Sequence, residues 1–515
     1  MIKGHIISVL IFTTISLIVL GLNAFPNYYA YINTPADKSF SGQASWFDPW
    51  DINVYVSAIK WGQQGNILLA NSYTTEGHTP VLMYPIYTLS GYIFPSVPPY
   101  LSFYFLAIIF GFLLLITILG LAKIFFSRNF EILIATTLIA LGGGVGWLFF
   151  PSIQSGDLFI TGFTFASHFQ RPHEALGIIF YLLSLIFFFK AATLKKIFFN
   201  LLSLGALLPL MLFYPYYFLS YALICGFYSL LIFLKKNDKK PFIYVFINAS
   251  LVIPFILIYL NHLRGSQGFS GVVSQQLNNP DIFQLVLGYG IISIFMVYQA
   301  IYLKKDKTTV FLNIWFFSSL LLSFLPFGFS RFYLRALFFP AVILSLLSLE
   351  LISSKLHLSK KFLISILLVI LPLSSFYMSY KRVAEVENNN HWYYLKSTER
   401  EALEFLDTKT PKGSGVLASY TMGNYIPANT NNKVYFGHLL QTPDAEEKIN
   451  NIIMFYSNKF SEDDAAEFVK EAGITYIIFG PEERNITLSN SQSMDLKYKF
   501  LHPVFKNPEV IIYTF

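Results

Sequence analysis

Two carboxylates, Asp48 and Asp51, stand three positions apart at the start of a segment with helical periodicity. A carboxylate held in such a place can take a proton from a hydroxyl as a general base, or can bind a divalent cation. Helix capping is the structural alternative, because Asp48 precedes a proline and Asp51 follows at the spacing of a capping box. The sequence leaves both interpretations open.

A second polar group occupies residues 168–174, directly before an apolar run. His168 and His173 are five positions apart, a spacing that does not put both on one helical face, so the indication of zinc binding is weak. Glu174 could act simply as a favourable charge at a helix N-terminus. Metal ligands therefore stay unassigned, and we group these side chains with polar residues of two other loops as the predicted substrate-binding set: Glu76, His78, His168, Arg171, His173, Glu174, Arg331 and Arg335.

The composition identifies the class of protein that carries these groups. Of 515 residues, 54% are hydrophobic and 13% are charged, which is more apolar surface than a soluble core can bury. Residues 1–380 hold 22 Lys and Arg against 11 Asp and Glu, whereas residues 381–515 hold 14 against 18. The basic excess behind the net charge of +7 therefore belongs to membrane loops and argues against nucleic-acid binding. The single cysteine, Cys225, excludes an intrachain disulfide and a paired-cysteine redox motif.

The hydropathy pattern predicts about eleven membrane-spanning helices. The first is interpreted as a retained helix rather than a signal peptide, because no convincing cleavage site follows it. The predicted spans lie near residues 4–22, 101–126, 130–150, 171–191, 197–213, 215–234, 241–260, 281–303, 308–326, 335–353 and 361–379.

The loops between these spans differ in basic residues. With a cytoplasmic N-terminus, sixteen Lys and Arg fall in inner loops and six in outer loops, as the positive-inside rule requires. This pattern predicts a multi-pass plasma-membrane protein with its C-terminal domain outside the cytoplasm. The spans hold almost no charges away from their ends, which argues against an ion-coupled transporter.

Arg331 and Arg335 flank a Phe-Tyr-Leu step on the predicted outer side. Guanidinium groups bind phosphate oxygens in a fork geometry, so this pair could hold a phosphate. Extension of the side chains toward the membrane interface is the alternative. We favour phosphate binding, because basic residues are scarce on the outer side.

The first outer loop, residues 23–100, is long enough to suggest a functional role. Its segment 46–62 reads as an amphipathic helix that lies on the membrane and holds Asp48 and Asp51 at the lipid surface. Residues 80–95 are apolar but short, and are interpreted as an interfacial helix rather than a span. We therefore assign residues 1–379 to a transmembrane domain that includes this loop.

Residues 380–515 read as a soluble α/β domain. Helices are expected at 399–409 and 462–472, and strands at 415–419, 474–479 and 510–514.

Several segments resemble those of GT-C type membrane glycosyltransferases, which include the protein mannosyltransferases. The resemblance is narrower to a prokaryotic branch of predicted membrane glycosyltransferases, and its motifs are degenerate. It rests on residues 51–65, 73–76, 85–87, 418–425 and 437–448, together with the long first loop and the number of spans.

The resemblance implies a donor sugar on a polyprenyl phosphate or pyrophosphate, and an inverting reaction with an acidic base from the first outer loop. By position that base is Asp51 or Asp48. The chain lacks the adjacent Asp-Glu pair of protein mannosyltransferases, so the choice stays open. Some members use a divalent cation and others none, which leaves the cofactor unknown.

We therefore expect transfer of a hexosyl or pentosyl group from a polyprenyl-phosphate carrier to a protein, lipid or glycan acceptor on the outer face of the membrane. The alternative is a non-catalytic membrane protein that binds or flips lipid-linked glycans.

Overall fold

The computed structural model describes residues 2–45, 48–159, 162–273, 281–301, 306–486, 494 and 497–515. The chain divides into two compact units. The helical unit comprises Met1–Pro26, Phe105–Ile258 and Gln276–Arg382. The loop-and-tail unit comprises Asn27–Tyr104, Tyr259–Gln275 and Val383–Phe515. The first loop, which the sequence led us to group with the membrane helices, thus packs with the C-terminal tail.

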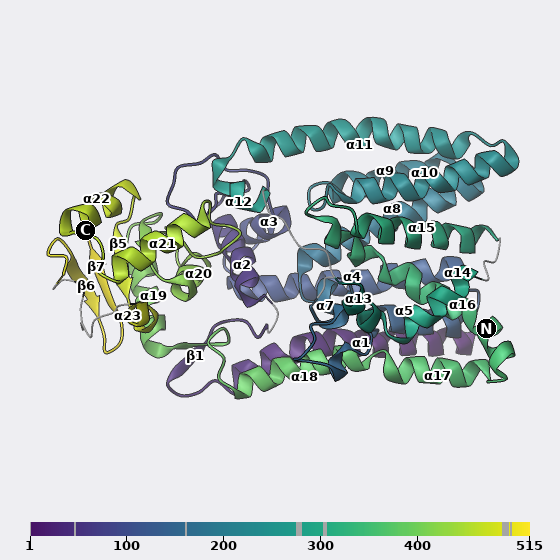
Figure 1. Ribbon diagram of the computed structural model, residues 1–515, viewed down its shortest axis with the longest axis horizontal. Helices are drawn as coiled ribbons and strands as arrows, with labels where there is room; N and C mark the ends of the chain where they lie inside the picture. Colours follow the sequence, from purple (N-terminus) through teal and green to yellow (C-terminus); the bar gives the residue numbers. More distant parts are fainter. Residues whose placement is uncertain are drawn as a thin grey trace. The chain divides into compact units, whose positions relative to one another are not determined.

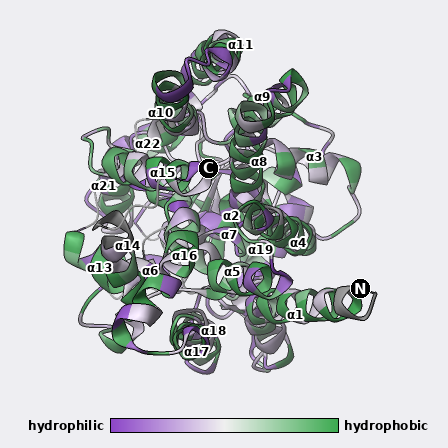
Figure 2. Ribbon diagram, turned by 90° about the vertical axis from the view of Figure 1, so that its right-hand side faces the viewer, coloured by the Kyte–Doolittle hydropathy of each residue, from purple (hydrophilic) through white to green (hydrophobic). Residues whose placement is uncertain are grey.

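Long helices aligned along a common direction form the helical unit (Figures 1 and 2). Helices α8 and α9 form an antiparallel hairpin, and α16 packs against α5, α14 and α15. The elements wholly or mostly in this unit are α1 (Ile2–Ile32), α4 (Pro99–Phe125), α5 (Asn129–Leu141), η1 (Gly146–Leu148), α6 (Gly156–Phe159), α7 (Thr164–His168), α8 (Pro172–Leu194), α9 (Ile197–Leu210), α10 (Tyr217–Lys236), α11 (Lys240–Arg264), α13 (Ile282–Tyr289), α14 (Ile291–Ile301), α15 (Lys307–Ser323), η3 (Ser330–Ala336), α16 (Phe338–Leu356), α17 (Lys360–Ile370) and α18 (Leu373–Glu387).

Eight helical segments within the described residues are long and apolar enough to cross a membrane. Each overlaps one of the eleven predicted spans, which confirms a polytopic helical membrane protein. Figure 2 shows how hydrophobic residues dominate helices such as α4 and α5. The eight segments are Ile6–Ile32, Pro99–Phe125, Asn129–Leu148, Pro172–Leu194, Tyr217–Lys236, Lys240–Arg264, Phe338–Leu356 and Lys360–Glu387.

The other three predicted spans are helical but shorter. Helix α9 has 14 residues and α15 has 17. The predicted span 281–303 is divided at Gly290, whose positive φ of 50° ends α13 before α14 begins. Hydropathy alone could not reveal this interruption, because the residues on both sides are equally apolar.

The loop-and-tail unit contains a mixed five-stranded sheet in the order β4-β3-β5-β7-β6. Strands β4, β3 and β5 are parallel, and β7 runs antiparallel to β5 and β6. The predicted α/β tail is thereby confirmed. Its elements, with those from the first loop, are β1 (Lys38–Phe40), α2 (Pro49–Gln63), α3 (Pro85–Ile93), η2 (Gln267–Phe269), α12 (Ser270–Val273), β2 (Tyr394–Lys396), α19 (Ser397–Lys409), β3 (Gly415–Leu417), α20 (Tyr420–Asn429), β4 (Lys433–Val434), α21 (Ala445–Tyr456), α22 (Glu462–Glu471), β5 (Tyr476–Phe479), α23 (Pro481–Ile486), β6 (His502–Lys506) and β7 (Ile511–Thr514).

The first loop joins the tail through paired backbone and packed helices. Strand β1 pairs with β2 in register, with Ser39 opposite Leu395. Helix α2 packs against α3 and against α20 of the tail. The loop begins later than predicted, because α1 continues past residue 23 to Ile32, through the proline at position 26. Hydropathy marks the end of the apolar run and not the end of the helix.

Helix α2 is buried on both of its faces. Besides Ile52, Tyr55 and Ile59, the polar residues Asn53 and Ser57 are buried. The helix was predicted correctly, but its interpretation as a surface helix with one polar face toward water is wrong. Its polar face contacts protein instead, because Asn53 and Lys60 bond to α20 residues. Periodicity cannot distinguish a polar protein partner from water. Trp46 and Phe47 of the predicted helical segment lie outside the described residues.

Candidate active site

Close backbone contact between α2 and α3 fixes the helix that carries the two candidate carboxylates. A Cβ atom added to Gly62 would lie 2.0 Å from the carbonyl oxygen of Thr88, and one added to Gly91 would lie 2.0 Å from that of Ile59. Only glycine permits this approach. The two helices therefore behave as one rigid support within the loop-and-tail unit.

Asp48 occupies the N-cap position of α2, with Pro49 as the first helical residue, as predicted. Its side chain makes no capping hydrogen bond. Its backbone has φ 45° and ψ 55°, the left-handed region, which non-glycine residues enter at a cost and which a following proline disfavours further. The capping interpretation thus holds for its position but not for its side chain.

Asp51, in the first turn of α2, lies beside a histidine from the tail. His438 Nε2 is 3.1 Å from Asp51 Oδ1. The backbone N–H groups of Leu440 and Gln441 donate to His438 Nδ1, at 3.1 and 3.2 Å. Because both N–H groups need an acceptor, Nδ1 carries no proton and Nε2–H donates to the carboxylate.

The pair combines a rigid partner with a reachable carboxylate. The His438 side chain is 2% exposed, whereas that of Asp51 is 21% exposed. Oδ1 accepts the histidine proton, and a substrate can approach the carboxylate from solvent. An oriented and accessible carboxylate is what a general base requires.

Asparagines support the loop that carries His438. Asn424 on α20 donates to the carbonyl of Gly437 at 3.0 Å and accepts from Asn53 on α2 at 2.5 Å. Tyr73 donates to the carbonyl of Asn424, and its ring meets His438 edge-on at 5.9 Å. These contacts tie the Asp51 helix and the His438 loop into one hydrogen-bonded layer.

The parallel strands explain why these groups meet. His438 follows strand β4, and Asn424 follows β3. The carboxyl ends of parallel strands lie at one edge of a sheet, where ligands bind in open α/β folds. The site therefore lies where the tail topology favours one.

Glu76 and His78 lie in the same unit but have other partners. Glu76 is paired with Lys448, a lysine that is 5% exposed and that also donates to Thr74 at 3.2 Å. His78 accepts from the backbone N–H of Asn71 at Nε2 and contacts the carbonyl of Glu76 through Nδ1. Burial lowers the pKa of His78. Both of its ring nitrogens thus serve the backbone.

The helical unit holds a second cluster around Glu174, at the start of α8. Arg335 of η3 is 3.0 Å from its Oε1, and Arg171 is 3.6 Å from the same oxygen. His168 Nδ1 lies 3.8 Å from Oε2. Burial first, and then the charge of Arg335, lower the pKa of His168 to about 3, so this imidazole is neutral. Two guanidinium groups against one carboxylate leave one net positive charge.

Arg335 is enclosed by aromatic rings. Its guanidinium lies 4.4 Å from the ring centre of Phe332 and 5.2 Å from that of Tyr214. Burial is the largest single effect and opposes its charge, but the Glu174 carboxylate and then the Tyr216, Tyr214 and Tyr217 side chains together outweigh it and raise the pKa of Arg335. Its main partner is thus a carboxylate of the protein, which makes Arg335 a part of the buried framework. Arg331, in the same 3-10 helix, is half-buried.

The two histidines of the predicted pair, His168 and His173, contact different aromatic residues. His168 stacks on Phe339, whereas the ring of His173 lies 6.3 Å from that of Tyr214. Among the residues that the structure describes, no group of three or more His, Cys, Asp or Glu is arranged to hold a metal ion.

Sequence reasoning gave no role to His438, Asn424 or Lys448. A signal existed for all three, because residues 418–425 and 437–448 belonged to the segments that carried the family resemblance. That resemblance named no role for them. The 387 positions between Asp51 and His438 exceed any spacing rule.

The helices and the mixed sheet together resemble the fold of a known GT-C membrane glycosyltransferase over most of the chain, which confirms the predicted resemblance. Among the solved proteins that the chain resembles is the oligosaccharyltransferase AglB of the archaeon Archaeoglobus fulgidus. Its apo crystal structure matches with a TM-score of 0.54 and 15% identity, over 92% of this chain and 69% of that one. AglB with an inhibitory peptide and a dolichol-phosphate matches with a TM-score of 0.52 and 14% identity, over 92% and 70%.

A third AglB structure, tethered to an acceptor peptide with an NVT sequon, has a TM-score of 0.51 at 15% identity, over 90% of this chain and 69% of that one. No family model and no curated protein matches the sequence. At this identity the likeness shows the fold alone, and the reaction must be argued from the site.

Proposed function

We propose that this chain is a glycosyltransferase that moves a sugar from a polyprenyl-phosphate carrier to an acceptor, with Asp51 as the general base. The observation that carries the proposal is the Asp51–His438 hydrogen bond, at 3.1 Å, in a chain with a GT-C fold. The bond orients a carboxylate that keeps access to solvent.

In the proposed reaction, Asp51 accepts one proton from the acceptor, and its carboxylate must be oriented toward that proton. The acceptor heteroatom gives its proton to the Asp51 carboxylate as it bonds to the anomeric carbon. The bond between that carbon and the phosphate oxygen breaks, and the polyprenyl phosphate leaves with the bonding electrons. Attack opposite the leaving group inverts the anomeric centre. His438 Nε2–H acts through Asp51 and holds its carboxylate in position.

For the carrier phosphate we propose Arg331, assisted by the net positive charge of the Arg171–Glu174–Arg335 cluster. Arg335 then contributes mainly through its ion pair with Glu174, at 3.0 Å. His168 and His173 are proposed to line this region. Glu76 and His78 are proposed to shape the first loop near Asp51, because their partners are Lys448 and backbone groups.

Membrane orientation is also proposed. The sixteen-to-six division of basic loop residues supports a cytoplasmic N-terminus, with Asp51 and the tail on the outer side. The transferred group, hexosyl or pentosyl, and the acceptor are left to experiment. AglB has been captured with peptides and with dolichol-phosphate, so peptide acceptors belong in the panel beside lipids and glycans.

The test is a transfer assay on the purified chain in lipid nanodiscs. Radiolabelled polyprenyl-phosphate mannose, glucose, N-acetylglucosamine and arabinose are each offered with peptide, lipid and glycan acceptors, and carrier release and labelled product are measured. At least one pair should react. Asp51→Asn should lower its rate by about a hundred- to ten-thousand-fold.

Asp37→Asn is the matched control, since Asp37 is an exposed aspartate of the same loop. Donor binding without carrier release in every pair would instead identify a protein that only binds lipid-linked glycans. Full activity of Asp51→Asn would place the base elsewhere.

A further inference from the structure

A cavity in the loop-and-tail unit lies apart from Asp51, toward the other end of α2. It has a volume of about 240 Å³ and is lined by 12 residues. Lys60, nine positions after Asp51, is on the order of 14 Å further along the helix axis at 1.5 Å per residue. The cavity is therefore a separate site from the Asp51–His438 pair.

Its lining is basic. Lys60, Lys412 and Lys433 contribute ammonium groups, and the lining contains no carboxylate. Lys60 is paired with Asp407 at 3.2 Å and donates to the carbonyl of Asn429. Lys412 is exposed and Lys433 is half-buried, so both can turn toward a ligand. The residual charge of the cavity favours an anion.

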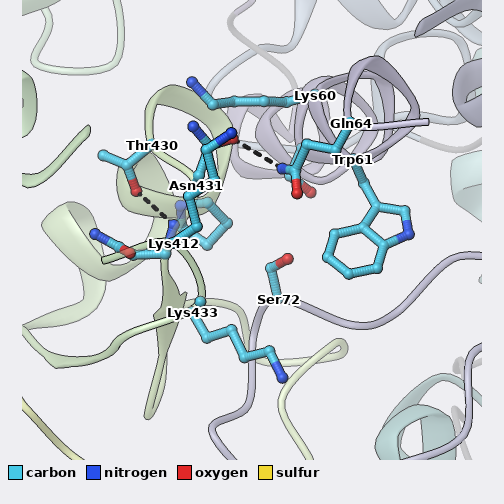
Figure 3. Close-up of a pocket in the computed structure, with 12 residues that line it drawn as sticks. Lys60, Trp61, Gln64, Ser72, Lys412, Thr430, Asn431 and Lys433 are labelled. Carbon is cyan, nitrogen blue, oxygen red and sulfur yellow. Dashed lines mark hydrogen bonds between the residues drawn. The ribbon is translucent and has the colours of Figure 1, made fainter. Parts of the chain in front are cut away.

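Its remaining walls suit a sugar. Figure 3 shows the indole of Trp61 on one side of the cavity and Asn431 on the other, with Gln64 and Ser72 between them. The Trp61 Nε1–H donates to the carbonyl of Leu68 at 2.8 Å, which fixes the ring plane. Gln64 donates to Asn431 at 2.8 Å. A fixed aromatic ring with amides at its rim can hold the apolar face and the hydroxyls of one pyranose.

We infer that this cavity binds one anionic sugar residue, with its ring against Trp61 and its carboxylate or phosphate on Lys412 and Lys433. The size agrees with this, because about 240 Å³ lies below the roughly 300–1,000 Å³ of sites for drug-sized ligands. The site would hold an acidic glycan on the enzyme without taking part in bond cleavage.

Calorimetric titration of the purified full-length protein tests the inference. D-glucuronate and glucose 6-phosphate are the two anionic probes, and they distinguish a carboxylate from a phosphate. D-glucose and inorganic phosphate supply the sugar and the anion alone. One anionic sugar should bind at least about ten-fold more tightly than either fragment, with an affinity that falls as salt is added.

Lys412→Gln with Lys433→Gln should weaken that binding about ten-fold or more and should remove its salt dependence. Lys459→Gln with Lys497→Gln is the matched control, since both lysines are exposed and lie outside the lining. Trp61→Phe should weaken sugar binding and leave phosphate binding alone. Asp51→Asn should bind the probe normally, even if it abolishes transfer.

Three results would each overturn the inference. The first is no binding of either anionic sugar at millimolar concentration. The second is equal binding of inorganic phosphate, which would mean a simple anion site. The third is unchanged binding by the double lysine variant, whose folding is checked by its melting temperature.

Discussion

His438 donates its Nε2 proton to Asp51 Oδ1 over 3.1 Å, and two backbone N–H groups fix which nitrogen carries that proton. The histidine therefore acts as a hydrogen-bond donor to the carboxylate. Its other ring nitrogen, Nδ1, is occupied as the acceptor of the two backbone N–H groups. The role that we propose for His438 is therefore to position the Asp51 carboxylate, and not to act as a second base.

Substitution at His438 tests this role. His438→Phe removes the donor, so the Asp51 carboxylate should lose its orientation, and turnover should fall about ten- to a hundred-fold, the usual cost of a lost supporting contact. His438→Gln retains an N–H donor and should recover part of the rate. The measurement is kcat and KM for donor and acceptor. A loss confined to the donor KM would argue for a binding role instead.

Asp48 is expected to matter for conformation more than for chemistry. Its φ of 45° is tolerated by asparagine and strained for a β-branched residue. Asp48→Asn should therefore keep turnover and the melting temperature near those of the wild type, whereas Asp48→Val should cost about 1–2 kcal/mol of stability. Thermal unfolding and the transfer assay together check this. An inactive but stable Asp48→Asn would exchange the roles assigned to Asp48 and Asp51.

The sequence predicted those features of the fold that are written locally. Apolar runs predicted the membrane helices, and Asp48-Pro49 predicted the start of α2 at Pro49. Gly290 stands in an apolar run, so neither its positive φ nor the break between α13 and α14 could be inferred. The burial of Asn53 could not be predicted either, because its partner Asn424 is 371 positions away in the sequence.

The candidate site was predictable in part for the same reason. Composition and position drew attention to Asp51, Glu174 and Arg335, but their partners depend on the tertiary fold. Arg335 illustrates this. Basic residues are scarce on the predicted outer side, which suggested that Arg335 binds a phosphate, whereas the structure pairs it with Glu174 at 3.0 Å. A single sequence cannot distinguish an arginine that pairs with a carboxylate of the protein from one that pairs with a ligand.

That ion pair predicts different outcomes for the two arginines. Glu174→Gln leaves Arg335 buried with a weaker partner and should cost about 3–5 kcal/mol of stability, the usual range for breaking a buried pair. Arg335→Met should also destabilise, while the double variant should recover part of the loss. Arg331→Ala should leave the melting temperature unchanged and weaken donor binding about ten-fold or more.

Thermal unfolding and titration with a polyprenyl-phosphate sugar separate these effects, and Arg264→Ala on α11 is the matched control for removing an arginine. If Arg335→Ala folds normally and loses only donor affinity, the phosphate role belongs to Arg335 after all.

The buried imidazole of His168 predicts how stability depends on pH. Burial and the charge of Arg335 lower its pKa from 6.5 to about 3, and its charged neighbours are Arg335 and Glu174. Between these pH values His168 is protonated in the unfolded chain but neutral in the folded protein. The contribution of His168 to stability should therefore be fully present above pH 6.5, and the stability should fall as the pH drops toward 3, by up to about 1.4 kcal/mol per pH unit.

His168→Gln removes the titrating group, so its stability should fall less steeply between pH 6.5 and 4.5, whatever its stability at pH 8. His502→Gln, which replaces an exposed histidine of β6, is the matched control. Melting temperatures across this range give the slopes, and equal slopes for His168→Gln and the wild type would show that His168 is protonated in the folded protein.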